Sequence, residues 1–525
     1  MSFHSLLFLL ISTGTLLAAP AGGEAGKPNI LLILADDLGF SDLGCYGGEI
    51  ETPNLDRIAS GGLRYTQFYN TARCWPTRSA LLTGYYAQQI RRDSIPGVPK
   101  AGGRGKRPEW APLLPELLKP AGYRSYHAGK WHVDGMPIAG GFDRSYYLKD
   151  QGRFFNPTKH WLDDQALPAV KKRSGFYATT ELADRTIEFL KEHEREHAGR
   201  PFFHYLAFAA PHFPLHALPQ DIAKYSETYL SGWEEIRKKR FERIGALGLF
   251  EVELSRVERD LGPPYHFPDA LEILGKGEVN RPLPWSSLTP EQQKFQADKM
   301  AIHAAMVDRM DQEIGRVIDQ IEQMGQLQNT LILFLSDNGA SAEIMVRDDG
   351  HDPQAEPGSA STYLCLGPGW STVCNTPFRR HKTWTHEGGI ATPLIVSWPE
   401  QIRARGELCA SPGHVIDFVP TILGLTGLKP PGGAPAGPGK NLVPTFFGEP
   451  VAARDSLWWF HDGHRAIRVG DWKLVSAKGE RWELYDLSKD RAEQQDMGSR
   501  EPQRVEQMAA EWGRQLEAAR RLSSK

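Results

Sequence analysis

The clearest pattern along the chain is a series of short apolar runs separated by segments whose apolar residues recur at helical spacing. Short runs that are apolar throughout, without alternation, are typical of strands buried on both faces of a parallel sheet. The pattern therefore predicts an α/β fold with a mostly parallel central sheet flanked by helices. The predicted strands are 29–35, 123–128, 201–210, 331–335 and 392–397.

Ionisable or coordinating residues follow most of these strands directly. In open α/β sheets the ligand crevice lies outside the carboxyl ends of the strands, so topology would bring these residues to one edge. Asp, Asn and Gly are also common in ordinary turns, so a single strand end of this kind would mean little. Several ends with complementary chemistry favour one shared site. The residues concerned are Asp36 and Asp37, Lys130 and His132, His212, and Asp337 and Asn338.

Residues 292–324 predict one long amphipathic helix. We expect its acidic side chains to form a solvated face and His303 to be a packed or a surface histidine. The charged section 233–260 predicts a helical excursion on the surface. The acidic side chains in question are Asp308, Asp311, Glu313 and Asp319.

The first 26 residues are expected to be a signal peptide and its junction. The apolar run 6–17 ends in small residues and is too short to span a bilayer, although it lacks a preceding Lys or Arg. A buried helix is the alternative. The signal interpretation predicts a periplasmic or secreted protein, and since no second long apolar run follows, no membrane span is expected.

The remaining chain divides by composition into three parts. Residues 27–426 carry the predicted strands and form the expected catalytic α/β domain. Residues 427–450 are rich in Pro and Gly and predict a linker. Residues 451–525 predict a small α+β subdomain, with a short antiparallel sheet and a closing helix.

Composition limits the kinds of binding partner that we expect for this protein. The 525 residues are 40% hydrophobic and 24% charged, with 61 basic against 64 acidic side chains and a net charge of −3. This balance gives no reason to expect nucleic acid or an anionic membrane surface as a partner. Five cysteines are too few for a disulfide framework. Cys365 and Cys374 could pair or could remain two buried thiols, and the sequence leaves both open.

The two acidic strand ends offer only oxygen ligands. Asp36, Asp37, Asp337 and Asn338 supply carboxylate and amide oxygens, which select Ca²⁺ or Mg²⁺ over zinc or copper. Three crowded carboxylates also need a dication if all are to stay ionised. Taken singly, each pair could be a helix cap or a turn. Taken together, they predict a divalent-cation site, with Ca²⁺ expected and Mg²⁺ as the alternative.

The segment Cys74-Trp75-Pro76-Thr77-Arg78 has the strongest chemical signal. Proline favours the first helical turn, so a helix is expected to begin near Pro76, and a helix N-terminus binds anions. The segment resembles the signature of type I sulfatases of the alkaline-phosphatase-like superfamily. In that family a maturation enzyme oxidises the cysteine to formylglycine.

Further segments carry the same resemblance, which runs from Pro28 to about Val419. The stretches 375–378 and 385–389 look closest to bacterial arylsulfatases. Cys374 lacks the Pro-x-Arg context, so it is not the expected nucleophile. His386 and Glu387 could support the site or be structural, and they stay outside the expected catalytic set. The other resembling segments are Gly129-Lys130-Trp131-His132, Pro211-His212 and 379–389.

The resemblance implies hydrolysis of organic sulfate monoesters, on aryl or carbohydrate alcohols, through a formylglycine sulfate-ester intermediate. One divalent ion would be held by Asp36, Asp37, Asp337, Asn338 and the residue formed from Cys74. By the same resemblance, Arg78 holds the hydrated formylglycine and Asp337 helps to deprotonate the attacking hydroxyl.

The remaining catalytic roles also follow from the resemblance. Lys130 would bind the nucleophile or the sulfate oxygens, and His132 would act as the base that helps to release sulfate. Lys382 and a protonated His212 would lie nearest the leaving oxygen, with His212 as the acid. The expected partners are a small-molecule or glycan sulfate ester and the maturation enzyme.

Two other functions remain open. The same superfamily contains hydrolases of phosphonate monoesters and phosphodiesters, whose substrates are similar in size and charge to sulfate esters. A catalytically silent protein that binds sulfated glycans is the alternative from another class. Because the nucleophile, metal and cation positions are all present, the sequence favours the sulfatase.

Overall fold

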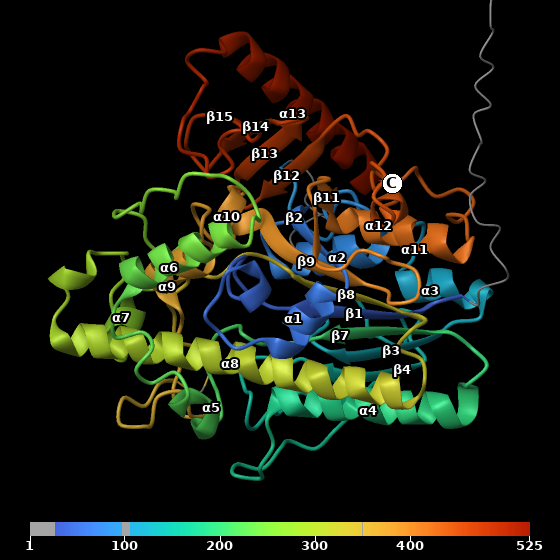
Figure 1. Ribbon diagram of the computed structural model, residues 1–525, viewed down its shortest axis with the longest axis horizontal. Helices are drawn as coiled ribbons and strands as arrows, with labels where there is room; N and C mark the ends of the chain where they lie inside the picture. The colour runs from blue at the N-terminus through green and yellow to red at the C-terminus, as the bar shows by residue number, and fades with distance from the viewer. Residues whose placement is uncertain (1–26, 97–104, 349, 525) are drawn as a thin grey trace, which may run out of the picture.

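The computed structural model describes residues 27–96, 105–348 and 350–524 (Figure 1). The predicted signal peptide, residues 1–26, lies outside the described residues. Within the described ranges, no helix is both long enough and apolar enough to cross a membrane.

A central mixed sheet organises the main part of the chain (Figure 1). Strand β1 (Asn29–Ala35) lies between β7 (Phe202–Ala207) and β8 (Thr330–Ser336) and is parallel to both. Beyond β7 come β3 (Arg124–Gly129) and β4 (Arg144–Leu148), also parallel. The predicted α/β class with a mostly parallel sheet is confirmed. The full order is β10-β2-β9-β8-β1-β7-β3-β4-β5-β6, with β11 paired to β2.

One predicted parallel strand runs the other way. Strand β9 (Ala391–Ser397) is antiparallel to both β8 and β2 (Leu63–Tyr69). An unbroken apolar run reports burial on both faces but not direction, so the sequence could not show this. Because β9 is reversed, its N-terminal end, rather than its C-terminal end, lies at the edge where β1 and β8 finish.

Helices cover both faces of the sheet. Alternate residues of β1 point to opposite faces. Leu31 and Ile33 pack in the core formed with α4 (Ala178–His197) and α8 (Pro290–Gln323). Ile30 and Leu32 pack in the core formed with α2 (Cys74–Thr83) and α11 (Phe418–Thr426). Figure 1 shows α4 and α8 side by side below the sheet and α2 and α11 above it.

The long helix α8 was expected to expose an acidic face, and this is wrong for three of its residues. Asp308, Asp311 and Glu313 are buried, whereas Asp319 is exposed. Helix α8 packs against α4, α5 and α1, so most of its circumference is covered. A buried carboxylate is costly unless it is hydrogen-bonded or paired. Asp311, for example, accepts hydrogen bonds from the backbone N–H groups of Asn54 and Leu55 at the start of α1.

The charged section 233–260 contains one helix, α6 (Trp233–Ala246). It is not wholly a surface excursion, because Arg237 and Arg240 are buried. Arg240 forms ion pairs with Asp42 and Glu49.

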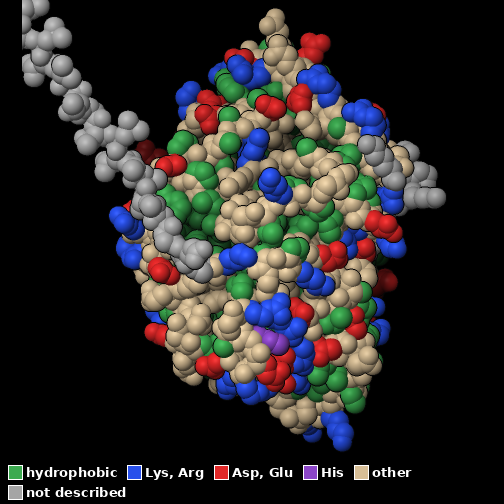
Figure 2. All heavy atoms as spheres, turned by 90° about the vertical axis from the view of Figure 1, so that its right-hand side faces the viewer, with side chains coloured by type: hydrophobic (Ala, Val, Ile, Leu, Met, Phe, Trp, Pro, Cys, Tyr) green, Lys and Arg blue, Asp and Glu red, His purple; other side chains and the backbone are tan. Residues whose placement is uncertain are grey.

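Figure 2 shows one face of the molecule, on which acidic and basic side chains are interspersed.

The C-terminal part has the predicted antiparallel sheet and closing helix. The strands β12 (Leu457–His461), β13 (His464–Val469), β14 (Trp472–Ser476) and β15 (Glu483–Asp486) pair in sequence order. Helix α13 (Pro502–Ser523) packs on β13 and β14. Buried residues of this sheet belong to the same two cores as the central sheet, so the packing is continuous.

All five cysteines are free, and Cys365 and Cys374 are two buried thiols. The remaining elements are short and connect or flank those above. They are η1 (Gly44–Tyr46), α1 (Pro53–Ser60), α3 (Leu114–Leu118), η3 (Lys119–Ala121), β5 (His160–Leu162), β6 (Gln165–Ala166), α5 (Pro219–Ala223), α7 (Pro268–Leu274), η4 (Trp285–Ser287), α9 (Gly367–Cys374), α10 (Glu387–Ile390), β10 (Glu407–Cys409), β11 (Gly413–His414), η5 (Val415–Asp417) and α12 (Val443–Phe446).

Candidate active site

The carboxyl ends of β1 and β8 meet at one edge of the sheet and bring four oxygen-bearing side chains together. Asp36 and Asp37 follow β1, and Asp337 and Asn338 follow β8. Asn338 Nδ2 donates to Asp37 Oδ1 at 2.7 Å, and Asp37 N donates to Asp337 Oδ1 at 3.4 Å. All four are buried, so water does not screen their charge.

These residues fit a bound divalent cation. Asp36 Oδ1 and Asn338 Oδ1 are buried acceptors without a hydrogen-bond partner among the described residues. Buried acceptors without a donor are costly, and a cation would satisfy them. The four side chains offer oxygen donors only, which suits Ca²⁺ or Mg²⁺.

Cys74 is the first residue of α2 and is 3% exposed. Its Sγ and one carboxylate oxygen each from Asp36 and Asp337 all lie within 4.8 Å of one another. Burial raises the pKa of the Cys74 thiol, against the opposing effect of Lys130 and Lys382. The sulfur atom therefore lies beside two of the expected metal ligands and within the electrostatic reach of both expected lysines.

Arg78, one helical turn beyond Cys74, is wholly buried. Its Nε donates to Asp337 Oδ2 at 2.8 Å, and its Nη1 donates to the carbonyl of Lys130 at 2.9 Å. The residues that follow β8 and β3 thus fix the guanidinium. Cys74 and Arg78 lie on the same face of α2, because residues four apart in a helix are neighbours on its surface.

The two lysines pair with the aspartates that follow β1. Lys130, after β3, donates to Asp36 Oδ2. Lys382 Nζ lies 2.8 Å from Asp37 Oδ2 and 2.7 Å from Oδ1. Burial alone would lower the pKa of Lys382, but the neighbouring Asp37 and Glu343 raise it well above its usual range. Lys382 therefore keeps its positive charge.

The expected histidines differ in how the structure places them. His212 Nε2 lies 3.7 Å from Asp37 Oδ2, so this ring belongs to the cluster. Burial lowers the pKa of His212 to about 4, although Asp37 acts in the opposite direction. His132 follows Lys130 by two residues, and its carbonyl accepts from Arg92 Nη2 at 3.2 Å. Its role as a base stays a prediction.

Asp337 binds a proton more tightly than an ordinary aspartate does. Burial and the neighbouring Asp36 raise the pKa of Asp337 to about 7, against the effect of Arg78 and Lys130. Burial would also raise the pKa of Asp36, but Lys130, His212 and Arg78 hold it well below its usual range. Without a dication, Asp337 is therefore the carboxylate of this cluster that is partly protonated near neutral pH.

Two residues of the site escaped sequence reasoning. Glu343 is 1% exposed and lies 3.2 Å from Lys382 Nζ and 3.0 Å from Arg73 Nη2. Arg73 occupies the N-cap position of α2, directly before Cys74, and its Nη1 donates to Thr383 Oγ1 at 2.8 Å. The position of Arg73 beside Cys74 was a usable signal, whereas Glu343 lies in an irregular segment that no pattern distinguishes.

Backbone strain gathers around the cluster. Asp37, Ala72, His132 and Thr383 all have positive φ, with 89° at the β-branched Thr383. Residues other than glycine rarely adopt this region, and such strain persists where the surrounding contacts fix the backbone. The N–H of Thr383 donates to the carbonyl of Ala72 at 2.8 Å, which joins the loop of Lys382 to the loop before Cys74.

His386 and Glu387, which we left outside the expected catalytic set, contact the C-terminal part of the chain instead. Glu387 accepts from Lys473 Nζ at 2.8 Å and from Arg491 Nη2 at 2.9 Å. His386 Nε2 lies 3.3 Å from Glu483 Oε2. Both therefore have a structural role between the two sheets.

Comparison with known proteins identifies the family. The sulfatase family model matches residues 28–428. The chain belongs to the sulfatase family. A second model, described as N-sulphoglucosamine sulphohydrolase, C-terminal, matches residues 379–521. Family membership makes the protein a sulfuric ester hydrolase with the alkaline-phosphatase-like architecture.

Relatives with curated descriptions align over most of the chain. An uncharacterized sulfatase of Schizosaccharomyces pombe is 32% identical and covers 93% of each chain. An arylsulfatase of Klebsiella aerogenes is also 32% identical, over 78% of this sulfatase and 90% of that protein. The human N-acetylgalactosamine-6-sulfatase is 27% identical, over 86% of this chain and 72% of its own.

Solved structures show the same fold. The structure of Ps i-CgsB in complex with k-i-k-neocarrahexaose superposes with a TM-score of 0.67 at 23% identity, covering 94% of each chain. The PsFucS1 sulfatase from Pseudoalteromonas sp. gives a TM-score of 0.60 at 19% identity, over 95% of this sulfatase and 92% of that chain. At these identities the likeness concerns the fold alone.

Proposed function

We propose that this sulfatase hydrolyses aryl or carbohydrate sulfate monoesters by covalent catalysis, with Cys74 converted to formylglycine and one divalent cation bound beside it. The observation that carries the proposal is the position of Cys74 Sγ at a helix N-terminus, within 4.8 Å of carboxylate oxygens of both Asp36 and Asp337. The names of the relatives, an arylsulfatase and an N-acetylgalactosamine-6-sulfatase, support the substrate class.

The cation proposed is Ca²⁺, with Mg²⁺ as the alternative, held by Asp36, Asp37, Asp337, Asn338 and the modified residue 74. When bound, the cation would supply positive charge to a sulfate oxygen, and the hydrated aldehyde would supply a hydroxyl nucleophile. The unpartnered oxygens of Asp36 and Asn338 support these ligands.

The protein's own side chains would orient and charge the site. Arg78 holds residue 74 from a guanidinium already fixed by Asp337, and Lys130 and Lys382 provide positive charge for the sulfate oxygens. His212 would donate a proton to the leaving oxygen. Its pKa of about 4 in the ligand-free state means that a bound anionic ester must raise the pKa before this step.

The test uses purified protein produced together with a formylglycine-generating enzyme. Mass spectrometry of the peptide that contains Cys74 should show the aldehyde, and an aryl sulfate should be turned over faster than the matching aryl phosphonate. Dominant phosphonate turnover would favour the hydrolase of phosphonates and phosphodiesters. An unmodified thiol with sulfated-glycan binding but no turnover would favour the silent binding protein.

The export of this sulfatase is a separate proposal, supported by the apolar run 6–17 and the small residues after it. Cell fractionation with N-terminal sequencing of the mature protein tests it. A cytoplasmic protein that retains residues 1–26 would contradict it.

A further inference from the structure

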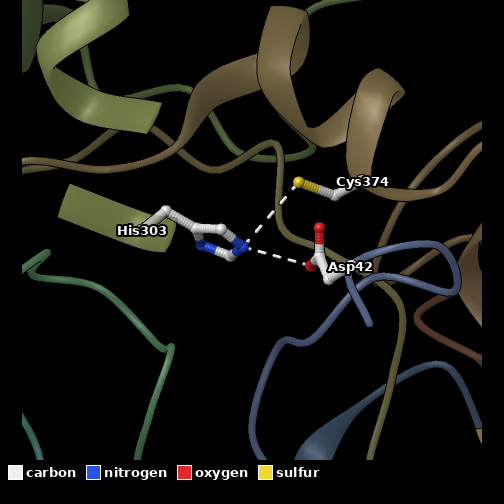
Figure 3. Close-up of side chains that lie close together, drawn as sticks. All are labelled: Asp42, His303 and Cys374. Carbon is white, nitrogen blue, oxygen red and sulfur yellow. Dashed lines mark hydrogen bonds and ion pairs between the residues drawn. The ribbon is translucent and has the colours of Figure 1, made fainter. Parts of the chain in front are cut away.

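A second buried cluster is formed by Asp42, His303 and Cys374 (Figure 3), and its histidine lines the same small cavity as Asp37 of the candidate active site. Asp42 belongs to the loop that follows β1, His303 to α8, and Cys374 ends α9. None of the three is more than 1% exposed, and one donor atom from each lies within 4.8 Å of the others. We propose that these three side chains form a second metal site, which binds a zinc-like divalent cation.

The contacts converge on one atom. His303 Nε2 lies 3.1 Å from Asp42 Oδ2 and 3.8 Å from Cys374 Sγ, and Figure 3 shows both contacts on the same side of the ring. A hydrolytic Cys–His–Asp relay would use the two opposite ring nitrogens. The burial of Cys374 also keeps substrate away from its sulfur. The cluster therefore has the geometry of ligands around a shared point, and not that of a nucleophile with its base.

The spacing and donor types suit zinc. Zinc bonds of about 2.0–2.3 Å to N, O and S ligands place tetrahedral ligand atoms roughly 3.3–3.8 Å apart. The separation of 3.8 Å between His303 Nε2 and Cys374 Sγ lies at the upper end of this range, and that of 3.1 Å between Nε2 and Asp42 Oδ2 falls just short of its lower end, so a small outward shift of the carboxylate would admit the ion. Thiolate, imidazole and carboxylate together favour a borderline metal, whereas the oxygen-only active site favours a hard one. The two sites would therefore select different cations.

Charges around the cluster leave room for a dication. Asp42 Oδ1 accepts from Arg240 Nη1 at 2.7 Å, but Arg240 also contacts both carboxylate oxygens of Glu49, at 2.8 and 2.7 Å. Glu49 thus balances Arg240. The charges of Asp42 and of a Cys374 thiolate would then balance the cation. On binding, the S–H bond of Cys374 breaks, its proton passes to solvent, and the sulfur lone pair bonds the metal without any change of oxidation state.

The other ring nitrogen of His303, Nδ1, is left for a hydrogen-bond partner outside the cluster. His303 Nδ1 is buried and has no partner among the described residues. A small cavity, with room for about one water molecule, is lined by His303, Asp37 and Ser341, among others. A water there could accept from Nδ1–H, as the second nitrogen of a metal-bound histidine requires.

A metal at this point would fasten segments that carry the active site. Ser41 N donates to the carbonyl of Cys374 at 2.9 Å, and a Cβ at Gly39 would lie 2.3 Å from that same oxygen, so the two backbones are in close contact. The next residue, Asn375, accepts from Ala340 N at 2.9 Å and donates to the carbonyl of Arg380 at 3.2 Å. The cation would link the loop of Asp36 and Asp37 to the loops that follow β8 and that carry Lys382.

Cobalt provides the test, because Co²⁺ bound by a thiolate in a tetrahedral site absorbs light in a way that Ca²⁺ and Zn²⁺ do not. The protein is the Cys74→Ala variant, which lacks the thiol beside the oxygen-rich site, stripped of metal and then kept in excess Ca²⁺. We expect one equivalent of Co²⁺ to produce a sulfur-to-cobalt charge-transfer band that Zn²⁺ abolishes by displacement.

Paired variants assign the band. Adding Cys374→Ser to this background should remove the band and weaken Zn²⁺ binding at least tenfold, whereas Cys365→Ser, which removes another buried thiol, should leave both unchanged. A folded protein without the band, or a band that survives Cys374→Ser, would overturn the proposal. If Cys374→Ser does not fold, anomalous scattering at the zinc edge decides: a peak among the three donor atoms supports the site, and its absence rejects it.

Discussion

Arg78 Nε donates a 2.8 Å hydrogen bond to Asp337 Oδ2 across 259 positions of sequence, and both side chains are fully buried. This ion pair joins the first turn of α2, which carries Cys74, to the end of β8, which carries two of the proposed metal ligands. Cys74 and the proposed metal ligands are thereby held in one frame. The predictions below test this frame and the packing around it.

Cys74→Ala should abolish sulfate-ester turnover, because no other described side chain occupies the nucleophile position. The variant should keep its fold and its sulfate binding, since Lys130 and Lys382 are unchanged. Steady-state turnover of an aryl sulfate, with circular dichroism, checks this. Cys365→Ser is the control, a buried thiol outside the site. Near-full activity in Cys74→Ala would refute the covalent scheme.

Asp337→Asn should lose both bound cation and activity. The amide keeps the size of the side chain but removes the negative charge that would bind the cation and that pairs with Arg78. Metal analysis after gel filtration should show less than stoichiometric Ca²⁺, and turnover should fall by a factor of about 10²–10³, as for other charge-stabilising groups. Asp221→Asn removes a buried carboxylate paired with Arg309 elsewhere and should keep the metal. Retention of full metal content in Asp337→Asn would exclude Asp337 as a ligand.

Glu343→Gln should lower kcat/KM by about 10–100-fold while the fold is kept, as expected for a residue that orients catalytic groups. Glu343 raises the pKa of Lys382, so its neutralisation should move the alkaline limb of the pH–rate profile to lower pH. A purely structural role would not shift that limb. Glu480→Gln, which removes a partner of Arg380 at the surface, is the control. An unchanged profile would show that Glu343 does not act through Lys382.

Asp311 should make stability depend on pH. Burial raises its pKa to about 6, so between the unfolded value near 3.8 and about 6 the folded state binds more protons than the unfolded state. The contribution of Asp311 to the free energy of unfolding is fully present below the unfolded pKa and is lost as the pH rises through about 6. The free energy of unfolding should fall by roughly 3 kcal/mol over this range. Asp311→Asn should remove this slope in urea unfolding between pH 4 and 7. Asp319→Asn, a change at an exposed position of the same helix, should keep the slope. An equal slope in both variants would show that Asp311 is not its source.

Lys473→Met should destabilise the protein by roughly 3–5 kcal/mol, because it removes the positive charge that Glu387 and Glu493 share and leaves only Arg491 beside Glu387. Lys473 Nζ lies 2.8 Å from both Glu387 and Glu493, at the junction of the C-terminal sheet with the catalytic part. Lys489→Met removes an exposed ion pair and should change stability by less than about 1 kcal/mol. Denaturant unfolding measures both, and equal small effects would show that the junction does not depend on this pair.

Local pattern was enough to find β1, β8 and the C-terminal strands, because a strand's apolar run and its turn residues are neighbours in sequence. It failed for the direction of β9 and for the burial of Asp308, Asp311 and Glu313. A hydrophobic run does not encode strand direction, and the exposure of a helix face depends on what packs against it. Glu343 escaped for the same reason: its partners, Arg73 and Lys382, come from other segments.

The sequence by itself determined the chemistry, since the Cys-x-Pro-x-Arg segment and the acidic strand ends fix which groups are available and what they can bind. Only the tertiary structure decided which of these groups meet, which carboxylates keep a proton, and that Asp42, His303 and Cys374 lie together. Proximity across hundreds of residues and the desolvation of charges are products of packing, and no local stretch of sequence contains them.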